Sequence, residues 1–346
     1  MQGVPYVLPL NLLLNITILT SSAGTVYATA GIHPCSSSIF SRGYHKHHDE
    51  SESEGEAEHT PQCDPDPTKP IQDGNDGGVC PERSKRIIAD LTTLISESRA
   101  NNPGDLVAFG EFGLDYDRLH YCSKEVQLHS FRVQLQLAAS LSPQLPLFLH
   151  SRAAHADFVR LLKDAFGEKL ERLEKGGVVH SFTGTVEEMR ELMDLGLYIG
   201  INGCSFKTTE NCAVVKEVAL DRLMIETDGP WCEVRPSHEG WKYLVEWEKK
   251  AAAAASGTGT AQAAEPEKQQ QQQGKKKNQK KDLEVPERFK TVKKEKWEEG
   301  AMVKGRNEPC MIERVAKIIA TIKGVSLEEV CEASWANTVK VFGLKE

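Results

Sequence analysis

The feature that most constrains the fold of this chain is a regular alternation of short apolar segments with longer amphipathic ones. The apolar segments have the length and composition of strands, and they cover residues 26–30, 106–112, 147–149, 177–179, 197–201 and 223–225. The amphipathic segments have helical spacing and cover residues 84–99, 123–141, 154–166, 186–195, 311–323 and 327–342. Strands that alternate with helices form right-handed βαβ units and a parallel sheet, so the sequence predicts an α/β fold.

The number of strands bears on how such a sheet would close. Eight βα units would make a (β/α)8 TIM-type barrel. Six strands are clear in the sequence, and residues 12–19 could supply a seventh. We therefore expect a single barrel domain over residues 1–346 that lacks or replaces one or two strands at its N-terminal end.

Two segments differ in composition from the rest of the chain. Residues 36–83 hold three clustered histidines, an acidic run and then Pro-, Asp- and Gly-rich sequence, and residues 248–300 hold runs of alanine, glutamine and lysine. Neither segment has enough apolar residues to offset the entropy lost on ordering. We therefore predict two long disordered insertions, an acidic His-rich one at 36–83 and a low-complexity one at 248–300, both in surface loops of the barrel.

Charge and cysteine content narrow the class of protein. A net charge of −8 argues against a protein that coats nucleic acid by bulk electrostatics, but not against an enzyme that holds it through metal ions and a few arginines. Nine cysteines without a C-x-x-C pair fit neither a disulfide framework nor a zinc finger.

The apolar stretch 4–20 lacks the features of a secretory signal or a membrane span, because it is short, contains two prolines and lacks a basic start. We expect a protein of the cytoplasm and/or nucleus without a membrane partner.

Polar residues able to bind metal recur where the predicted strands end. His33 follows the first strand, Glu111 lies in the second, His150 ends the third and His180 ends the fourth, while Glu226 and Asp228 follow the strand at 223–225. The carboxyl ends of parallel strands all open on one face of a barrel. We therefore expect these side chains to gather at one mouth.

Four of these residues form a mixed nitrogen and oxygen ligand set, namely Glu111, His150, His180 and Asp228. Such a set suits one or two ions of Mg²⁺, Mn²⁺ or Zn²⁺. A metal neutralises phosphate charge and lowers the pKa of bound water, and a carboxylate can take the proton from that water. We expect Asp228 and Glu111 to be the catalytic residues. A single buried histidine or aspartate is more often structural; it is the recurrence at five strand ends that favours a metal site.

Several motifs resemble the TatD family of metal-dependent deoxyribonucleases in the amidohydrolase superfamily. They are Tyr-Ala-Thr-Ala-Gly-Ile-His-Pro at 27–34, Ala-Phe-Gly-Glu-Phe-Gly-Leu-Asp-Tyr at 108–116, Leu-Phe-Leu-His-Ser-Arg at 147–152, Gly-Val-Val-His-Ser-Phe at 177–182, Met-Ile-Glu-Thr-Asp-Gly-Pro at 224–230 and Arg-Asn-Glu-Pro at 306–309. The resemblance covers roughly residues 26–35, 84–246 and 301–344. The motifs are specific when they occur together and in this order.

This resemblance implies a distorted barrel that hydrolyses phosphodiester bonds in DNA with a divalent metal, often trimming from the 3′ end as a 3′–5′ exonuclease. It implies that Glu111, His150, His180 and Asp228 are metal ligands. The same resemblance makes His33 and Arg306 phosphate or substrate contacts, with Arg152 and Glu226 beside them. An arginine fork suits phosphate oxygens. DNA is the expected substrate, and no obligate protein partner can be inferred.

The start of the chain departs from the family. Family members begin with a strand that carries His-x-His or an Asp/Asn equivalent, whereas no histidine precedes His33 here. A truncated, non-catalytic barrel that retains metal or nucleic-acid binding is therefore an alternative. A metal-dependent amide or ester hydrolase of the same superfamily is another.

Overall fold

A six-stranded sheet organises the first part of the computed structural model, which describes residues 26–43, 76–256 and 285–344. Its strands follow chain order: β1 Ala28–Ala30, β2 Leu106–Asp115, β3 Leu147–Arg152, β4 Gly177–Val179, β5 Tyr198–Ile201 and β6 Leu223–Ile225. The pairs from β1 to β5 are all parallel. Parallel strands in chain order, with helices between them, are the topology of a (β/α) barrel, so the predicted fold class is confirmed. The seventh strand expected at 12–19 lies outside the described residues.

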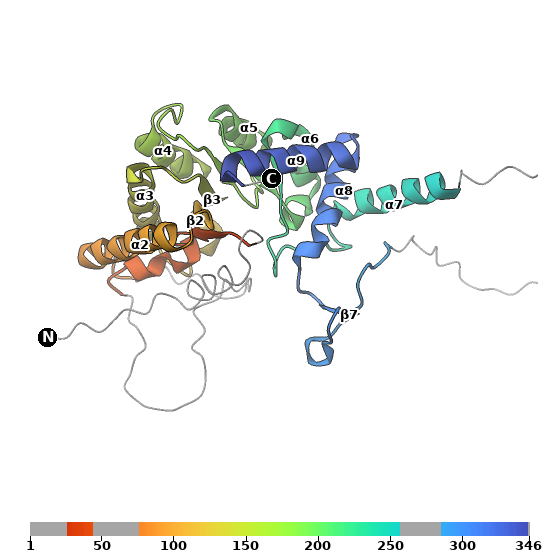
Figure 1. Cartoon of the computed structure of the whole chain (residues 1–346), viewed down its shortest axis with the longest axis horizontal. Coiled ribbons are helices and arrows are strands. Elements are labelled where there is room, and N and C mark those ends of the chain that lie inside the picture. The colour runs from red at the N-terminus through yellow and green to blue at the C-terminus, as the bar shows by residue number, and fades with distance from the viewer. Residues whose placement is uncertain (1–25, 44–75, 257–284, 345–346) are drawn as a thin grey trace, which may run out of the picture. The chain divides into compact units, whose positions relative to one another are not determined.

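The helices of this part match the predicted amphipathic segments. They are α2 Pro81–Asn101, α3 Lys124–Ser140, α4 His155–Phe166 and α5 Val186–Asp194. Side chains cap their starts: Ser123 accepts the amide hydrogen of Val126 ahead of α3, and Thr185 forms a capping box with Glu188 ahead of α5. Helices α2 and α3 pack beside β2, with α4 next to α3 (Figure 1).

An aromatic core joins β2 to the helices beside it. Phe112 on β2, Phe131 on α3 and Phe158 on α4 are fully buried, and their ring centroids lie 5.4 and 5.3 Å apart in turn. Each such side chain contributes about 1.5–3 kcal/mol on burial. This packing fixes β2 against α3 and α4, and so fixes the position of the site residues that β2 carries.

Strand β2 is longer than its sequence pattern predicts, ending at Asp115 and not at Phe112. Its close pairing with β3 depends on glycine, because a Cβ at Gly110 would overlap the carbonyl oxygen of Phe148 and one at Gly113 would overlap that of His150. Both glycines also have positive φ, +148° and +153°. Glycine at these positions lets the strand continue past the apolar run and carry Glu111 and Asp115 to the site.

The described residues divide into two compact units. The first holds the sheet, residues 217–224 and the chain from 332 onward; the second holds 202–216 and 225–331. Elements of the second unit are η3 Gly203–Phe206, α6 Thr209–Glu217, α7 Trp241–Ser256, the two-stranded sheet of β7 Thr291–Val292 and β8 Met302–Val303, and α8 Ile312–Lys323. Helices α7 and α8 pack together, with Lys317 bound to Glu248 at 3.0 Å. The final helix is α9 Leu327–Phe342, whose residues from 332 onward belong to the first unit, where Val341 packs in a cluster with Val178 and Tyr198.

The two expected insertions are only partly described. Residues 44–75 and 257–284 lie outside the described part, so the predicted disorder and the single-domain assignment stay predictions. Their flanks, however, are folded: η1 Pro34–Phe40 buries Phe40 against Cys122 and Val126, and Ser41 pairs with Val79. A few apolar residues at the edge of a polar segment suffice to anchor it, which average composition does not reveal. Among the described helices, none is long and apolar enough to cross a bilayer.

Candidate metal centre

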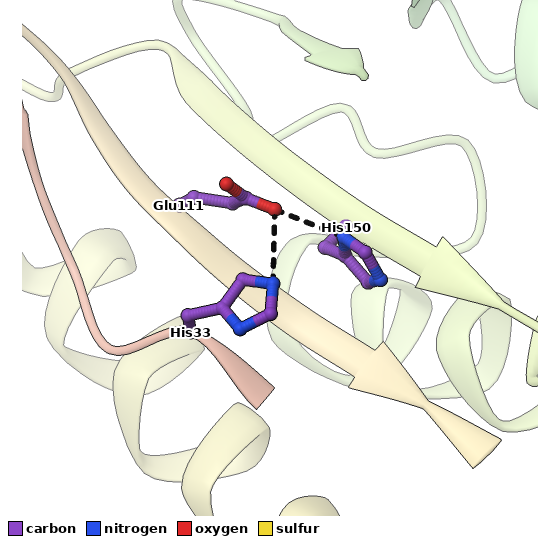
Figure 2. A group of neighbouring side chains, drawn as sticks. All are labelled: His33, Glu111 and His150. Carbon is purple, nitrogen blue, oxygen red and sulfur yellow. Dashed lines mark hydrogen bonds and ion pairs between the residues drawn. The ribbon is translucent and has the colours of Figure 1, made fainter. Parts of the chain in front are cut away.

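Four side chains from neighbouring strand ends meet in the first unit. His33 follows β1, Glu111 lies in β2, His150 lies in β3, and His180 comes directly after β4. Figure 2 shows His33 and His150 pointing toward the carboxylate of Glu111 from the two adjoining chain segments. The parallel order of β1 to β4 is what brings together residues that are far apart in the sequence.

One oxygen of Glu111 faces all three imidazoles. Glu111 Oε1 lies 2.6 Å from His180 Nε2, 2.9 Å from His150 Nδ1 and 3.3 Å from His33 Nε2. His150 Nδ1 and His180 Nε2 are themselves 3.4 Å apart. His33, Glu111 and His150 form a group whose ligand atoms lie within 4.8 Å of one another and could hold a metal ion. The sequence predicted His33 as a substrate contact, and its position in this group also makes it a candidate ligand.

The surroundings of Glu111 favour its ionised form. Burial by itself raises the pKa of this carboxyl. The charge of His180 and hydrogen bonds from His150, His180 and His33 outweigh burial and hold the pKa well below its ordinary value. Glu111 is therefore a carboxylate over the whole neutral range, which is the form that binds a cation.

Asp115 binds the nitrogen of the His150 ring that faces away from Glu111. Its Oδ2 lies 3.1 Å from His150 Nε2, while its Oδ1 accepts the backbone amide hydrogen of Asp117. Burial raises the pKa of this fully buried carboxyl, but the hydrogen bond and charge of His150, with Arg152 and Arg118 nearby, bring it below its usual value. A carboxylate on one ring nitrogen fixes the tautomer and leaves the other nitrogen to face a metal. Sequence analysis did not single out Asp115, although it lies in the 108–116 motif.

Arg152 opens onto a cavity beside the strand ends. It lies at the end of β3, and together with Ser151, His155, Phe182 and Thr183 it lines a volume of about 220 Å³. The cavity begins one or two residues after His150 and His180 along each strand. The lining of this cavity does not include His150 or His180, and the role predicted for Arg152 stays a prediction.

The remaining predicted site residues belong to the second unit. Asp228 accepts a hydrogen bond from the thiol of Cys232 at 3.1 Å, and Glu226 accepts one from Asn202 at 3.2 Å. Asp228 has a positive φ of 52°, an uncommon backbone state for a residue other than glycine. Arg306 lies in an exposed loop of the same unit. The convergence of Asp228, Glu226 and Arg306 with the Glu111 group stays a prediction.

Comparison with known proteins agrees with the motifs. The family model described as TatD related DNase matches residues 8–343. The chain belongs to this family. Deoxyribonuclease Tat-D of Schizosaccharomyces pombe is 42% identical over 260 residues, covering 75% of this chain and 68% of that protein. The 3′-5′ ssDNA/RNA exonuclease TatD of Cronobacter sakazakii is 43% identical over 150 residues, covering 41% and 54%.

A solved structure supports the fold over nearly the whole chain. An uncharacterized amidohydrolase from Saccharomyces cerevisiae superposes with a TM-score of 0.69 at 30% identity. The match covers 96% of this chain and 84% of that one. The barrel topology of β1 to β6 is thus shared with a relative whose structure is known from crystals.

Proposed function

We propose that this TatD family chain is a metal-dependent deoxyribonuclease that hydrolyses phosphodiester bonds in DNA. The observation that carries the proposal is the convergence of one ionised carboxylate oxygen with three imidazole nitrogens at adjacent strand ends. The Schizosaccharomyces pombe relative is likewise named a deoxyribonuclease. Trimming from the 3′ end is part of the proposal, as is a location in the cytoplasm and/or nucleus.

The donor atoms fit a divalent cation. Glu111, His150 and His180 would hold it, with Asp228 as a further ligand and His33 close enough to bind the ion or a phosphate oxygen. Nitrogen and carboxylate ligands together suit Zn²⁺ or Mn²⁺, and Mg²⁺ is compatible with the carboxylates. When bound, the ion neutralises phosphate charge and lowers the pKa of a water molecule.

The chain's own residues supply the other steps. Asp228 accepts the proton of the attacking water, and the thiol of Cys232 fixes the carboxylate that does so. Arg152 and Arg306 bind phosphate oxygens through their guanidinium forks. Because the whole chain carries a net charge of −8, these local cations must overcome repulsion of the DNA backbone.

The test compares the full-length chain with Glu111→Gln and Asp228→Ala. Each is incubated with 3′- or 5′-labelled single- and double-stranded DNA in Mg²⁺, Mn²⁺ or EDTA. Asp194→Ala, an exposed change on α5, is the matched control. Metal-dependent shortening by the parent and the control, with a loss of at least about 100-fold in both site variants, is the expected result.

Two other outcomes would replace the proposal. A folded parent that cuts no DNA with any metal would support the truncated, non-catalytic barrel. Faster turnover of an ester or amide than of DNA would support a different hydrolase of the superfamily.

A further inference from the structure

The turn that carries Asp228 also presents a large aromatic side chain to solvent. Trp231 is 44% exposed, and its backbone amide donates to the carbonyl oxygen of Asp228 at 2.8 Å. The indole is therefore held by the same four-residue turn as the carboxylate proposed to act on water. An exposed tryptophan lacks the burial that usually stabilises this side chain, and exposed aromatic surface is typical of binding sites.

A second loop is fastened to this turn. The side chain of Asn307 donates to the carbonyl oxygen of Thr227 at 2.7 Å, and its backbone amide donates to that of Pro230 at 2.9 Å. Asn307 is only 5% exposed. A Cβ at Gly229 would lie 3.0 Å from the carbonyl oxygen of Asn307, so glycine allows this close approach. These contacts hold the loop of Asp228 and the loop of Asn307 together.

The hydrogen bond between Asn307 and Pro230 joins the loop of Trp231 to the loop of Arg306. Trp231 follows Pro230, and Arg306 precedes Asn307, so the two exposed residues flank a hydrogen-bonded pair. A flat aromatic surface beside a positive charge is the combination that binds one base and one phosphate of a single strand.

Another exposed tryptophan of the same unit differs from Trp231. The indole nitrogen of Trp297 donates to the carbonyl oxygen of Ala301 at 2.9 Å, although that side chain is 58% exposed. For Trp231, no acceptor of the indole hydrogen occurs among residues 26–43, 76–256 and 285–344. Trp297 is thus tied into its own loop, whereas Trp231 offers both a ring face and a donor.

We propose that Trp231 stacks on an unpaired nucleobase of the DNA strand whose phosphate is bound by Arg306. This inference rests on the proposed function and specifies its substrate, a single strand or a frayed end. Stacking tolerates any sequence because every base has a flat face, but it requires that the base be unpaired. A continuous duplex should therefore gain nothing from Trp231.

The test measures binding separately from hydrolysis. Anisotropy of a labelled single-stranded oligonucleotide is recorded in EDTA with the full-length chain, Trp231→Ala, Trp231→Phe and the control Trp297→Ala. We expect Trp231→Ala to raise the Kd about 5- to 150-fold, Trp231→Phe to keep most of the affinity, and Trp297→Ala to match the parent. An oligonucleotide of abasic residues provides the decisive comparison, because the parent and Trp231→Ala should then bind it equally.

A stacking role also predicts a spectroscopic signal. DNA should quench part of the tryptophan emission of the parent and of Trp297→Phe, but much less that of Trp231→Phe. Equal Kd values for the parent and Trp231→Ala, or the same loss on the abasic strand, would overturn the stacking role while leaving the nuclease proposal intact. Failure of the parent to bind DNA in EDTA, together with failure to hydrolyse it with any metal, would overturn both.

Discussion

At the scale of single residues, the carboxylate of Asp115 accepts two hydrogen bonds. Its two oxygens accept from the amide of Asp117 and from Nε2 of His150, and the side chain is fully buried. An asparagine has the same shape but only one accepting atom. We therefore expect Asp115→Asn to release the His150 ring or shift its tautomer, and to weaken Mn²⁺ binding about 10- to 100-fold. Calorimetric titration of the purified chain measures this.

Asp194→Asn serves as the control for charge alone. Asp194 is exposed on α5, so its loss should leave the Mn²⁺ affinity at the parental value. Both variants should unfold cooperatively, and their melting curves establish that. If Asp115→Asn binds Mn²⁺ as tightly as the parent, the orientation of His150 does not depend on Asp115.

At the scale of elements, one carboxylate connects the starts of α3 and α4. Asp157 in the first turn of α4 binds Lys124 Nζ of α3 at 2.8 Å, the hydroxyl of Tyr116 at 2.8 Å and Arg160 at 2.9 Å. Hydrogen bonds from Arg160, Lys124 and Tyr116 hold the pKa of this carboxyl far below its usual value. A negative charge at a helix start is also stabilised by the helix dipole.

The sign of the pH effect follows from that lowered pKa. The folded state keeps Asp157 ionised to lower pH than the unfolded state does, so its contribution to the free energy of unfolding is present above about pH 4. It is lost as the pH falls toward the folded-state value. We expect Asp157→Asn to lower the Tm by about 2–4 °C at pH 7, for a loss of about 1 kcal/mol in this partly exposed network.

Melting curves at several pH values provide the measurement. The difference in Tm between the parent and Asp157→Asn should shrink below about pH 4. Asp164 lies on the same helix with its side chain 63% exposed, so Asp164→Asn should alter the Tm little at any pH. A constant difference down to pH 2 would mean that the charge of Asp157 is not what matters.

Local patterns were sufficient to predict most of the elements. All six strands of the sheet overlap predicted segments, because apolar runs and turn residues act over a few positions. The extension of β2 to Asp115 was missed, since it depends on the fit of Gly113 against the carbonyl oxygen of His150. That contact joins residues 37 positions apart on neighbouring strands, as the register pairs Gly113 with His150. Periodicity carries no information about it.

At the scale of the whole molecule, strand order explains why part of the site was predictable. Once β1 to β4 are parallel and adjacent, Glu111, His150 and His180 must meet, and the structure brings them together. His33 was expected at the same mouth because it follows β1, but the 3.3 Å distance from its Nε2 to Glu111 Oε1 depends on how the chain turns after that strand. The predicted contribution of Asp228 depends on how a second unit is positioned, which no local rule supplies.

Because the candidate ligands come from four different strand ends, we predict that a bound metal ion stabilises the fold against unfolding. The candidate ligands come from β2, β3 and the segments after β1 and β4, so a bound ion links four strand ends. A ligand at 100 times its Kd adds about 2.7 kcal/mol to the free energy of unfolding, which corresponds to a rise in Tm of about 5–10 °C. We expect this rise with Mn²⁺ or Zn²⁺ in scanning calorimetry, and its reversal by EDTA.

Glu111→Gln distinguishes this centre from other metal-binding groups in the chain. The variant keeps the clustered histidines at 45, 47 and 48, which could bind metal by themselves, but it loses the charge that faces the three imidazoles. Its Tm should therefore rise by less than about 2 °C with metal, whereas His129→Asn on α3, outside the centre, should show the full rise. An equal rise in Glu111→Gln and the parent would locate the stabilising ion elsewhere, and would remove the main support for a metal centre at these strand ends.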